Sequence, residues 1–281
     1  MSIESKVLGQ QVAYPTDYCP SILVPVPRSL NREIYDIHTP EELFRGFDTW
    51  HAYEAGFLTR NGLPVCGVLK LVYPANSPCI VESKSLKLYL NSLNMTRLGE
   101  DIPSGIETYL QTVKSDLEQI LQTRIEATFF RQAPEKPYFD FQDYMLLEAM
   151  PGIEQATFTE YSENPALLES RTTGRGEIKV CSHLLRSNCK ITKQPDWGSI
   201  YIHIQADCLP DHASLLKYIV SLRNENHFHE EICEMTYKRL WDLFHPEILA
   251  VSCIYTVITV TPSQTGGSVD GGSWQMTPAG A

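Results

Sequence analysis

One order of segments occurs twice along this chain of 281 residues, and it is the feature that most constrains the fold. Each half has the pattern of two strands, then two helices, then a third strand. Strands that follow each other directly favour hairpins, and strands followed by a run of helices are typical of α+β proteins. We therefore expect an α+β fold with antiparallel sheets, made of two tandem modules at residues 1–160 and 161–281.

The first half begins with a proline-rich segment, PSILVPVPRSLNREIYD, which we expect to be extended. Two strands, FDTWHAYEAGFL and PVCGVLKLVY, flank the pair Asn61-Gly62, which predicts a hairpin. A short helix over ESKSLKLYLNSL precedes a longer one, for which Asp101 is the expected cap. The segment RIEATFFRQ is the expected third strand.

The second half has its strands at GEIKVCSHLL, SIYIHIQ and ILAVSCIYT. Alternation of Ile200, Ile202 and Ile204 with polar residues predicts a sheet with one buried face. The helix over DHASLLKYIVSL has Asp211 as its expected cap, and the helix over FHEEICEMTYKRLWDLF is expected to stop at His245-Pro246.

Charge and cysteine usage limit the functional classes. The formal net charge of -11 argues against a nucleic-acid-binding surface, which needs clustered basic residues. No apolar run reaches the roughly 18 residues of a membrane span, and the N-terminus has no secretory pattern. We therefore expect a cytoplasmic protein that binds neither nucleic acid nor membrane, with its eight cysteines reduced.

Cys189 stands in a polar stretch, and Asp196 follows it in the segment QPDWGS, where we expect a turn. A thiol becomes a nucleophile where its thiolate is favoured, and an acid is needed to protonate what it attacks. The pair therefore suggests a nucleophile with its proton donor. A buried cysteine beside a turn-forming aspartate has the same spacing.

The segment NHFHEE places His227, His229 and Glu230 at the start of a helix. A histidine suits proton transfer near neutral pH, and a buried glutamate can hold a guanidine-like edge by paired hydrogen bonds. A carboxylate in the first helical turn also simply favours the helix dipole.

The segment VESKSLKLY contains Lys84 and Lys87 on one helix face, with Ser83 at the helix start. A helix N-terminus with two lysines can hold a phosphate, although ordinary solvated lysines have the same pattern. Cys181, His183 and Cys189 lie close in sequence but lack the paired short spacings of structural zinc sites. No Gly-rich dinucleotide-binding loop occurs, so a nicotinamide cofactor would need another kind of site.

In combination these segments resemble the NADPH-dependent 7-cyano-7-deazaguanine reductases, the nitrile reductases of queuosine biosynthesis, in their two-module form. The resemblance rests on PVPRSLNR, ESKSLKLY, SHLLRSNCKITKQPDWGS and FHE, and it extends from about residue 15 to Thr256. It implies the tunnelling fold, in which strand-strand-helix-helix-strand-strand modules assemble into a barrel. It also implies a homodimer that reduces a nitrile to an aminomethyl group with two NADPH.

The resemblance assigns the reacting groups to the second module. Cys189 is the nucleophile that forms a covalent thioimidate with the nitrile carbon, and Asp196 is the proton donor. His229 assists protonation in the second reduction.

The resemblance divides the binding residues between the modules. Glu230 and Phe228 hold the deazaguanine ring, and Val81, Glu82 and Ser83 complete its pocket.

The cofactor site lies in the first module by the same resemblance. Ser83 and Lys84 hold NADPH, and Lys87 lies on its phosphates. No metal is implied.

The chain departs from the family pattern after CIYT. The family continues with an Arg-Gly-Gly-rich strand that contributes to cofactor binding, whereas the segment from Val257 onward has no basic residue. We expect a tail of low complexity there rather than a core strand.

Two alternatives stay open at this stage. One is a GTP cyclohydrolase-type enzyme of the same fold, with zinc on Cys181, His183 and Cys189. The other is a non-catalytic purine- or pterin-binding protein.

Overall fold

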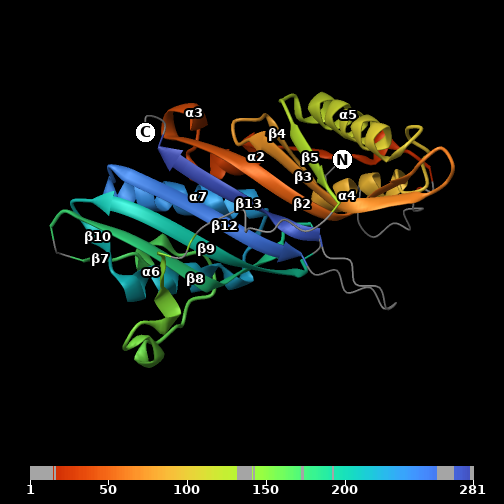
Figure 1. The fold of residues 1–281 in the computed structure, drawn as a ribbon. Helices are drawn as coiled ribbons and strands as arrows, with labels where there is room; N and C mark the ends of the chain where they lie inside the picture. The colour runs from red at the N-terminus through yellow and green to blue at the C-terminus, as the bar shows by residue number, and fades with distance from the viewer. Residues whose placement is uncertain are drawn as a thin grey trace. The chain divides into compact units, whose positions relative to one another are not determined.

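The computed structural model describes residue 15, residues 17–131, residue 141 and residues 143–171, 174–191, 193–257 and 269–278. The chain divides into two compact units. Unit 1 comprises residues 1–30, 48–137 and 257–271, and unit 2 comprises residues 31–47, 138–256 and 272–281. The division into repeated modules at residue 160 stays a prediction. The α+β composition and the antiparallel pairing of the long strands are confirmed (Figure 1).

Unit 1 has the order of elements that its half of the sequence predicts. Its main sheet has the strand order β2-β3-β5, and a short strand pair lies beside it. The turn after β2 places Gly62 in the left-handed region at φ 85°, as the Asn-Gly signal predicts. The elements are β1 (Pro25–Pro27), β2 (Phe44–Leu58, which begins in unit 2), β3 (Pro64–Pro74), β4 (Cys79–Val81), α4 (Ser83–Ser92), α5 (Ile102–Leu121) and β5 (Glu126–Phe130).

Helix α5 approaches the sheet closely because Gly105 has no side chain. A Cβ at Gly105 would lie 2.4 Å from the Phe57 ring, which stacks on Tyr109 at a centroid distance of 5.6 Å. The predicted cap is confirmed, since the Asp101 carboxylate accepts a hydrogen bond from the Ser104 amide at 2.9 Å.

Unit 2 is built on the strand order β11-β8-β9-β12. The long strands pair antiparallel, whereas the short strands β6 and β11 pair parallel with β8. Helices α6 and α7 lie against this sheet (Figure 1). The elements are β6 (Met145–Leu146), β7 (Ser170–Arg171), β8 (Gly176–Cys189), β9 (Pro195–Ala206), β10 (Leu209–Pro210), α6 (His212–Ser221), β11 (Asn226–His227), α7 (His229–Phe244) and β12 (Ile248–Val257).

The alternation predicted for β9 is confirmed. Ile200, Ile202 and Ile204 are fully buried, while Tyr201 and His203 are only half-buried. Because successive side chains point to opposite sides of a strand, every even-numbered residue of β9 belongs to one face. We call this the covered face, since α7 packs on it.

The proline-rich segment is extended only in part, at β1 (Pro25–Pro27), so that expectation is wrong for the rest of it. Short helical turns lie within and after the segment, and proline, whose φ is already set, begins two of them, at Pro20 and Pro40. These turns are η1 (Pro20–Ile22), α2 (Ser29–Arg32), η2 (Glu33–Tyr35) and α3 (Pro40–Leu43). Later turns are η3 (Leu147–Ala149), η4 (Ile153–Gln155), η5 (Pro165–Leu167) and η6 (Leu222–Asn224).

The expectation of a tail without a strand is also wrong in part. Strand β13 covers Val269–Pro278, because backbone pairing does not require basic or strongly apolar residues. Residues 258–268 and 279–281 lie outside the described residues.

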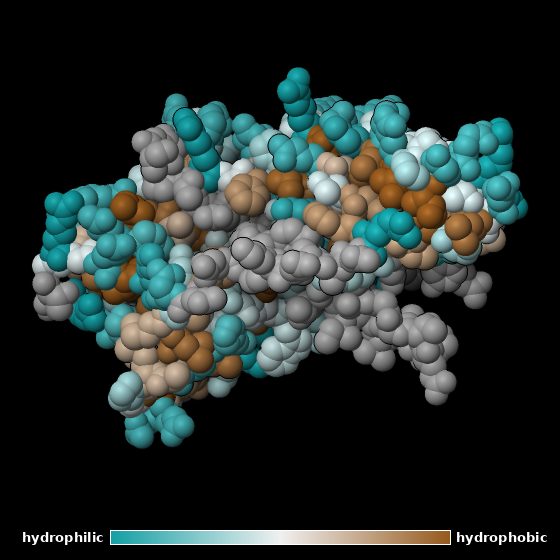
Figure 2. Space-filling model, viewed as in Figure 1, coloured by the Kyte–Doolittle hydropathy of each residue, from teal (hydrophilic) through white to brown (hydrophobic). Residues whose placement is uncertain are grey.

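The described surface is predominantly polar on the face that Figure 2 shows, where hydrophilic side chains surround smaller hydrophobic areas. None of the helices in the described ranges has the length and apolar character needed to cross a bilayer. All eight cysteines are outside disulfides.

The cap of α6 provides a test of how this fold is stabilised. The Asp211 side chain accepts a hydrogen bond from the Ser214 amide at 2.9 Å. Asp211→Ala is expected to lower the free energy of unfolding by about 1 kcal/mol, because that amide loses its partner. Urea denaturation measures the loss. Asp211→Asn keeps the acceptor and should retain most of the stability; equal losses in both variants would contradict this role.

Candidate functional site

The hairpin β8–β9 brings Cys189 and Asp196 together. Asp196 pairs directly with Ser187, and Cys189 lies two residues further along β8, on the same face as Ser187. Such diagonal neighbours have Cα atoms about 7 to 8 Å apart. Asp196 therefore belongs to β9 and to its covered face, and the expectation that it lies in a turn is wrong.

The turn between the two strands is closed by backbone hydrogen bonds on Cys189. Its amide donates to the Gln194 carbonyl at 2.8 Å, and its carbonyl accepts from the Lys193 amide at 2.9 Å. Lys193 takes the left-handed conformation with φ 60°, which lets the chain reverse before Pro195. These bonds connect Cys189 directly to Gln194, the residue just before β9.

His229 lies between Asp196 and an aromatic ring. Its Nε2 is 3.2 Å from Asp196 Oδ2, and its ring stacks on Tyr255 with centroids 4.0 Å apart and planes 4° apart. Gly198 leaves room for the Tyr255 ring, because a Cβ on residue 198 would lie only 3.0 Å from that ring. Burial raises the pKa of the Tyr255 hydroxyl well above its usual value, so this ring stays neutral. The imidazole is thus held in one orientation toward Asp196.

The first turn of α7 carries the other residues that were expected to bind the substrate. Phe228 precedes the helix as its N-cap, and it is half-buried. Glu230 is buried with 4% of its surface exposed, although it is a charged residue in a first turn. Strand β11 fixes this segment beside Cys189, since His227 pairs with Cys189 in parallel register.

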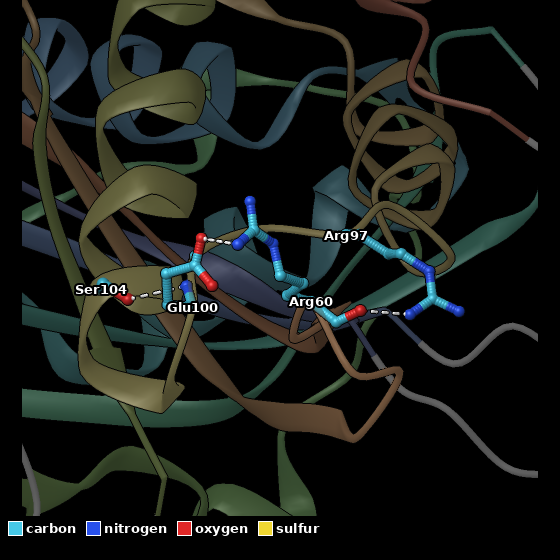
Figure 3. A pocket seen from close by; sticks show the side chains of 5 residues that line it. Arg60, Arg97, Glu100 and Ser104 are labelled. Carbon is cyan, nitrogen blue, oxygen red and sulfur yellow. Dashed lines mark hydrogen bonds and ion pairs between the residues drawn. The ribbon is translucent and has the colours of Figure 1, made fainter.

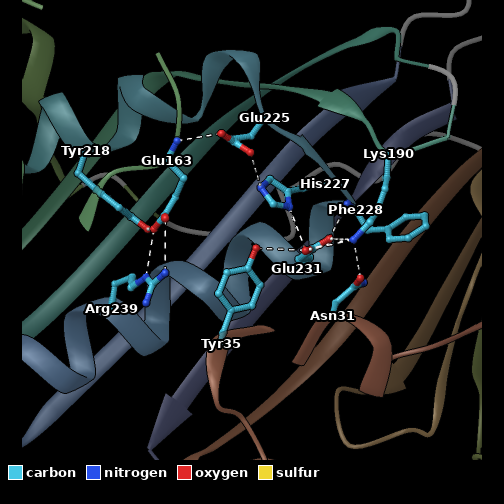
Figure 4. A network of polar contacts seen from close by, with 10 residues as sticks. All are labelled: Asn31, Tyr35, Glu163, Lys190, Tyr218, Glu225, His227, Phe228, Glu231 and Arg239. Atoms are coloured by element: carbon cyan, nitrogen blue, oxygen red, sulfur yellow. Dashed lines mark hydrogen bonds and ion pairs between the residues drawn. The ribbon is translucent and has the colours of Figure 1, made fainter. Parts of the chain in front are cut away.

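Glu231 gathers donors from the segments around the site (Figure 4). Its carboxylate lies 2.9 Å from His227 Nδ1 and 3.1 Å from Lys190 Nζ, and it accepts from the Tyr35 hydroxyl at 3.2 Å. The Phe228 amide also donates to it at 3.3 Å. Burial would raise the pKa of Glu231, but hydrogen bonds and positive charge from His227 and Lys190 outweigh burial and lower it.

A second carboxylate, which is half-buried, extends this network. Glu163 accepts hydrogen bonds from Arg239 Nε at 3.1 Å and from the Tyr218 hydroxyl at 3.2 Å. Its amide donates to Glu225, whose carboxylate lies 3.4 Å from His227 Nε2 (Figure 4). Each ring nitrogen of His227 therefore faces a carboxylate.

In unit 1, the residues from Val81 to Lys87 lead from the end of β4 into the first two turns of α4. Val81 and Glu82 are buried, and the Glu82 carboxylate caps the helix by accepting from the Lys84 and Ser85 amides at 3.1 and 2.7 Å. These two amides are therefore not open to a phosphate, which corrects the expected clamp at the helix end. Lys84 and Lys87 are half-exposed on one face of α4.

A surface pocket of unit 1 lies elsewhere, at the start of α5. Arg60, Arg97, Gly99, Glu100 and Ser104 line it, and Arg60 pairs with Glu100 at 2.5 Å (Figure 3). None of these residues is among those expected from the sequence to bind or react. The Arg60–Glu100 pair is largely exposed, so it is well screened by solvent.

The cysteines and the histidine of the zinc alternative do not converge. Cys181 and Cys189 stand eight residues apart on the extended strand β8, which separates them by roughly 25 Å. No group of three or more His, Cys, Asp or Glu side chains within the described ranges is placed to hold a metal ion. The donor set Cys181, His183 and Cys189 therefore does not form one site.

Sequence reasoning singled out His227 without giving it a role, and it missed Lys190, Glu231, Tyr255 and Gly198. The signal for Glu231 was its place three residues after Phe228, at the third position of the helix, where a glutamate closes a capping box. The stacking of Tyr255 on His229 had no local signal, because the two residues are far apart in the sequence.

Two family models match this chain. One, described as nitrile reductase, 7-cyano-7-deazaguanine-reductase N-term, matches residues 14–129. The other, described as QueF-like protein, matches residues 195–259. The matches include Glu82, Asp196 and the start of α7, while Cys189 lies between them.

Curated relatives match over nearly the whole length. A protein of Acinetobacter baumannii (strain SDF) is 36% identical over 259 residues, covering 91% of this chain and 90% of its own. A protein of Coxiella burnetii (strain Dugway 5J108-111) is 37% identical over 254 residues, covering 90% and 87%. Both are named NADPH-dependent 7-cyano-7-deazaguanine reductase. The chain therefore belongs to the family of the NADPH-dependent 7-cyano-7-deazaguanine reductases.

Proposed function

We propose that this protein reduces the nitrile of 7-cyano-7-deazaguanine to an aminomethyl group in queuosine biosynthesis, through a covalent thioimidate on Cys189. The observation that supports this most is the contact of His229 Nε2 with Asp196 at 3.2 Å, on the face of the β8–β9 hairpin to which Cys189 also belongs. Membership of the reductase family and the names of the relatives support the substrate.

The first step is an addition that needs no oxidant or reductant. The Cys189 sulfur forms a bond to the nitrile carbon, and the thiol proton passes to the nitrile nitrogen. A carboxyl group beside the thiol can take that proton and return it to nitrogen, which is the role we assign to Asp196. The resulting thioimidate accepts a hydride far better than the nitrile does, because its nitrogen can be protonated and the carbon then becomes more electrophilic.

The reduction consumes two hydrides and two protons in total. His229 is placed to assist Asp196 with these protons, because the two side chains are in contact and both are mostly shielded from water. The stacked Tyr255 ring holds the imidazole plane in place. A proton can therefore be delivered at a defined position.

The substrate ring is assigned to buried acceptors and to an aromatic face. Glu230, at the start of α7, would accept from the N–H edge of the deazaguanine, and Phe228 would pack on the ring. Glu82 uses two amide donors for its cap, and a carboxylate has room for further donors. The family resemblance also assigns Glu82, with Val81 and Ser83, to the substrate.

Two molecules of NADPH would each supply one hydride when bound. The chemistry of α4 fits the phosphates of NADPH, because Lys84 and Lys87 present two cationic side chains on one helix face, and Ser83 adds a hydroxyl. The Lys84 and Ser85 amides are taken by Glu82, so charge rather than the helix end would provide the attraction. The tunnelling fold and a homodimer are part of this proposal, and they rest on the family resemblance.

The nucleophile can be tested without NADPH. Wild-type protein mixed with 7-cyano-7-deazaguanine is expected to gain the mass of one substrate molecule, because the addition retains every atom. Cys189→Ala should gain none, while Cys181→Ala, eight residues earlier on β8, should still be modified. Intact-mass spectrometry measures all three. Unmodified wild-type protein would overturn the nucleophile, and retained binding without an adduct would favour a non-catalytic purine-binding protein.

The proton donor has its own test. Asp196→Asn is expected to slow adduct formation by about 10²- to 10⁴-fold, because the amide cannot take up and return the thiol proton. Asp207→Asn, an exposed aspartate after the far end of β9, provides the matched control and should react at the wild-type rate. Time-resolved intact mass gives the rates, and calorimetry checks that the substrate still binds. An unchanged rate in Asp196→Asn would remove Asp196 from the mechanism.

A further inference from the structure

We propose that Glu231 is a positioning residue for this reaction, whose carboxylate holds the segment of the nucleophile and the segment of the substrate-binding residues in their relative places. The inference rests on the function proposed above. The Glu231 carboxylate contacts the backbone amide of Phe228 and the side chains of Lys190, His227 and Tyr35, none of which is assigned to chemistry or to the substrate. It acts through the chain segments to which those groups belong.

One side of the carboxylate holds the segment of Cys189. Lys190, the next residue after Cys189, places its ammonium 3.1 and 3.3 Å from the two Glu231 oxygens. The same ammonium donates to Asn31 Oδ1 at 2.7 Å and lies 5.8 Å from the centre of the Phe228 ring. Lys190 therefore links the end of β8 both to Glu231 and to the aromatic ring assigned to the substrate.

The other side holds the start of α7. The Phe228 amide donates to Glu231 Oε2 at 3.3 Å, and His227 Nδ1 lies 2.9 Å from Oε1. His227 is also the register partner of Cys189 between β11 and β8. One carboxylate thus connects both neighbours of the reacting groups, Lys190 after Cys189 and the 227–228 segment before His229 (Figure 4).

Charge and burial explain why this role needs a carboxylate. The Glu231 side chain is only 1% exposed, and its two oxygens face donors from three chain segments, which a neutral side chain with one oxygen cannot match. A glutamine would turn an amide group toward Lys190 or His227, both of which are donors. At least one of the two connections would then break, and small displacements of reacting groups have large effects on rate.

The test measures how fast Cys189 forms its adduct in Glu231→Gln. We expect the maximal rate of adduct formation to fall by about 10- to 100-fold, while the fraction of protein that finally reacts stays near one. A merely structural role would instead reduce the reacting fraction, because unfolded molecules do not react, and would leave the rate of the folded molecules unchanged. Time-resolved intact mass over a range of nitrile concentrations separates the rate from the amplitude.

Glu234→Gln is the matched control. Glu234 lies three residues further along α7, is similarly buried, and pairs with Arg32 through two hydrogen bonds of 2.7 Å. Its loss also breaks a buried ion pair, so the thermal stability should fall comparably. Its rate of adduct formation should stay within about twofold of the wild type, because its carboxylate pairs with Arg32 rather than with the segments of Cys189 and Phe228. Equal rates in the two variants would overturn the inference.

A second variant decides the matter if Glu231→Gln does not fold. Lys190→Gln removes the ion pair between the segment of Cys189 and Glu231, together with the contacts of the ammonium with Asn31 and the Phe228 ring. The Lys190 side chain is 33% exposed, so folding is expected. The variant should also slow the adduct, because the segment of Cys189 loses its link to the carboxylate. A wild-type rate in Lys190→Gln would overturn the inference.

A readout without the nitrile separates this inference from the proposed function. Iodoacetamide alkylates exposed thiols, and peptide mass locates the reaction at Cys189. Glu231→Gln should change the alkylation rate of Cys189 relative to the wild type, and Glu234→Gln should not. If wild-type protein forms no nitrile adduct but this difference persists, the proposed function fails and the positioning role stands. If neither variant changes the alkylation rate, the positioning role fails.

Discussion

Alternation of side chains along the antiparallel pair β8 and β9 is the constraint on which the site depends. Because Asp196 pairs with Ser187, both residues and Cys189 belong to one face, and the same face carries the buried isoleucines of the core. A shift of one residue in the register would turn Asp196 to the opposite face, away from α7. The apolar core that fixes the register of this sheet therefore also fixes the reacting groups.

The second constraint is the start of α7. This helix brings His229 over the sheet, where Tyr255 and Asp196 hold its ring from two sides. It also buries two adjacent carboxylates, Glu230 and Glu231. Buried carboxylates are costly unless they are paired, and Glu231 has this cost offset by His227 and Lys190. The polar groups near the site are thus part of what stabilises its segments.

Unit 1 contributes a different kind of chemistry. Its helix α4 starts at a buried carboxylate, Glu82, that accepts from the Lys84 and Ser85 amides, while the side chains of Lys84 and Lys87 lie on one face of the helix. The amides and the lysines therefore serve separate purposes, which the sequence pattern alone does not distinguish. In unit 2 no lysine pair of this kind begins a long helix, since α7 starts with His229 and two glutamates. The two units are thus suited to different parts of the reaction.

The sequence by itself determined the order of the long elements, the caps at Asp101 and Asp211, the hairpin at Gly62 and the buried face of β9, because these follow from local periodicity and turn chemistry. Its motifs also determined the family, which the relatives confirm. Only the tertiary structure decided that Asp196 belongs to a strand, that Glu82 is a cap, and that Tyr255 and Glu231 support the site. The physical reason is that these roles depend on strand register and on packing between residues far apart in the chain, and such contacts leave no periodic signal in the sequence.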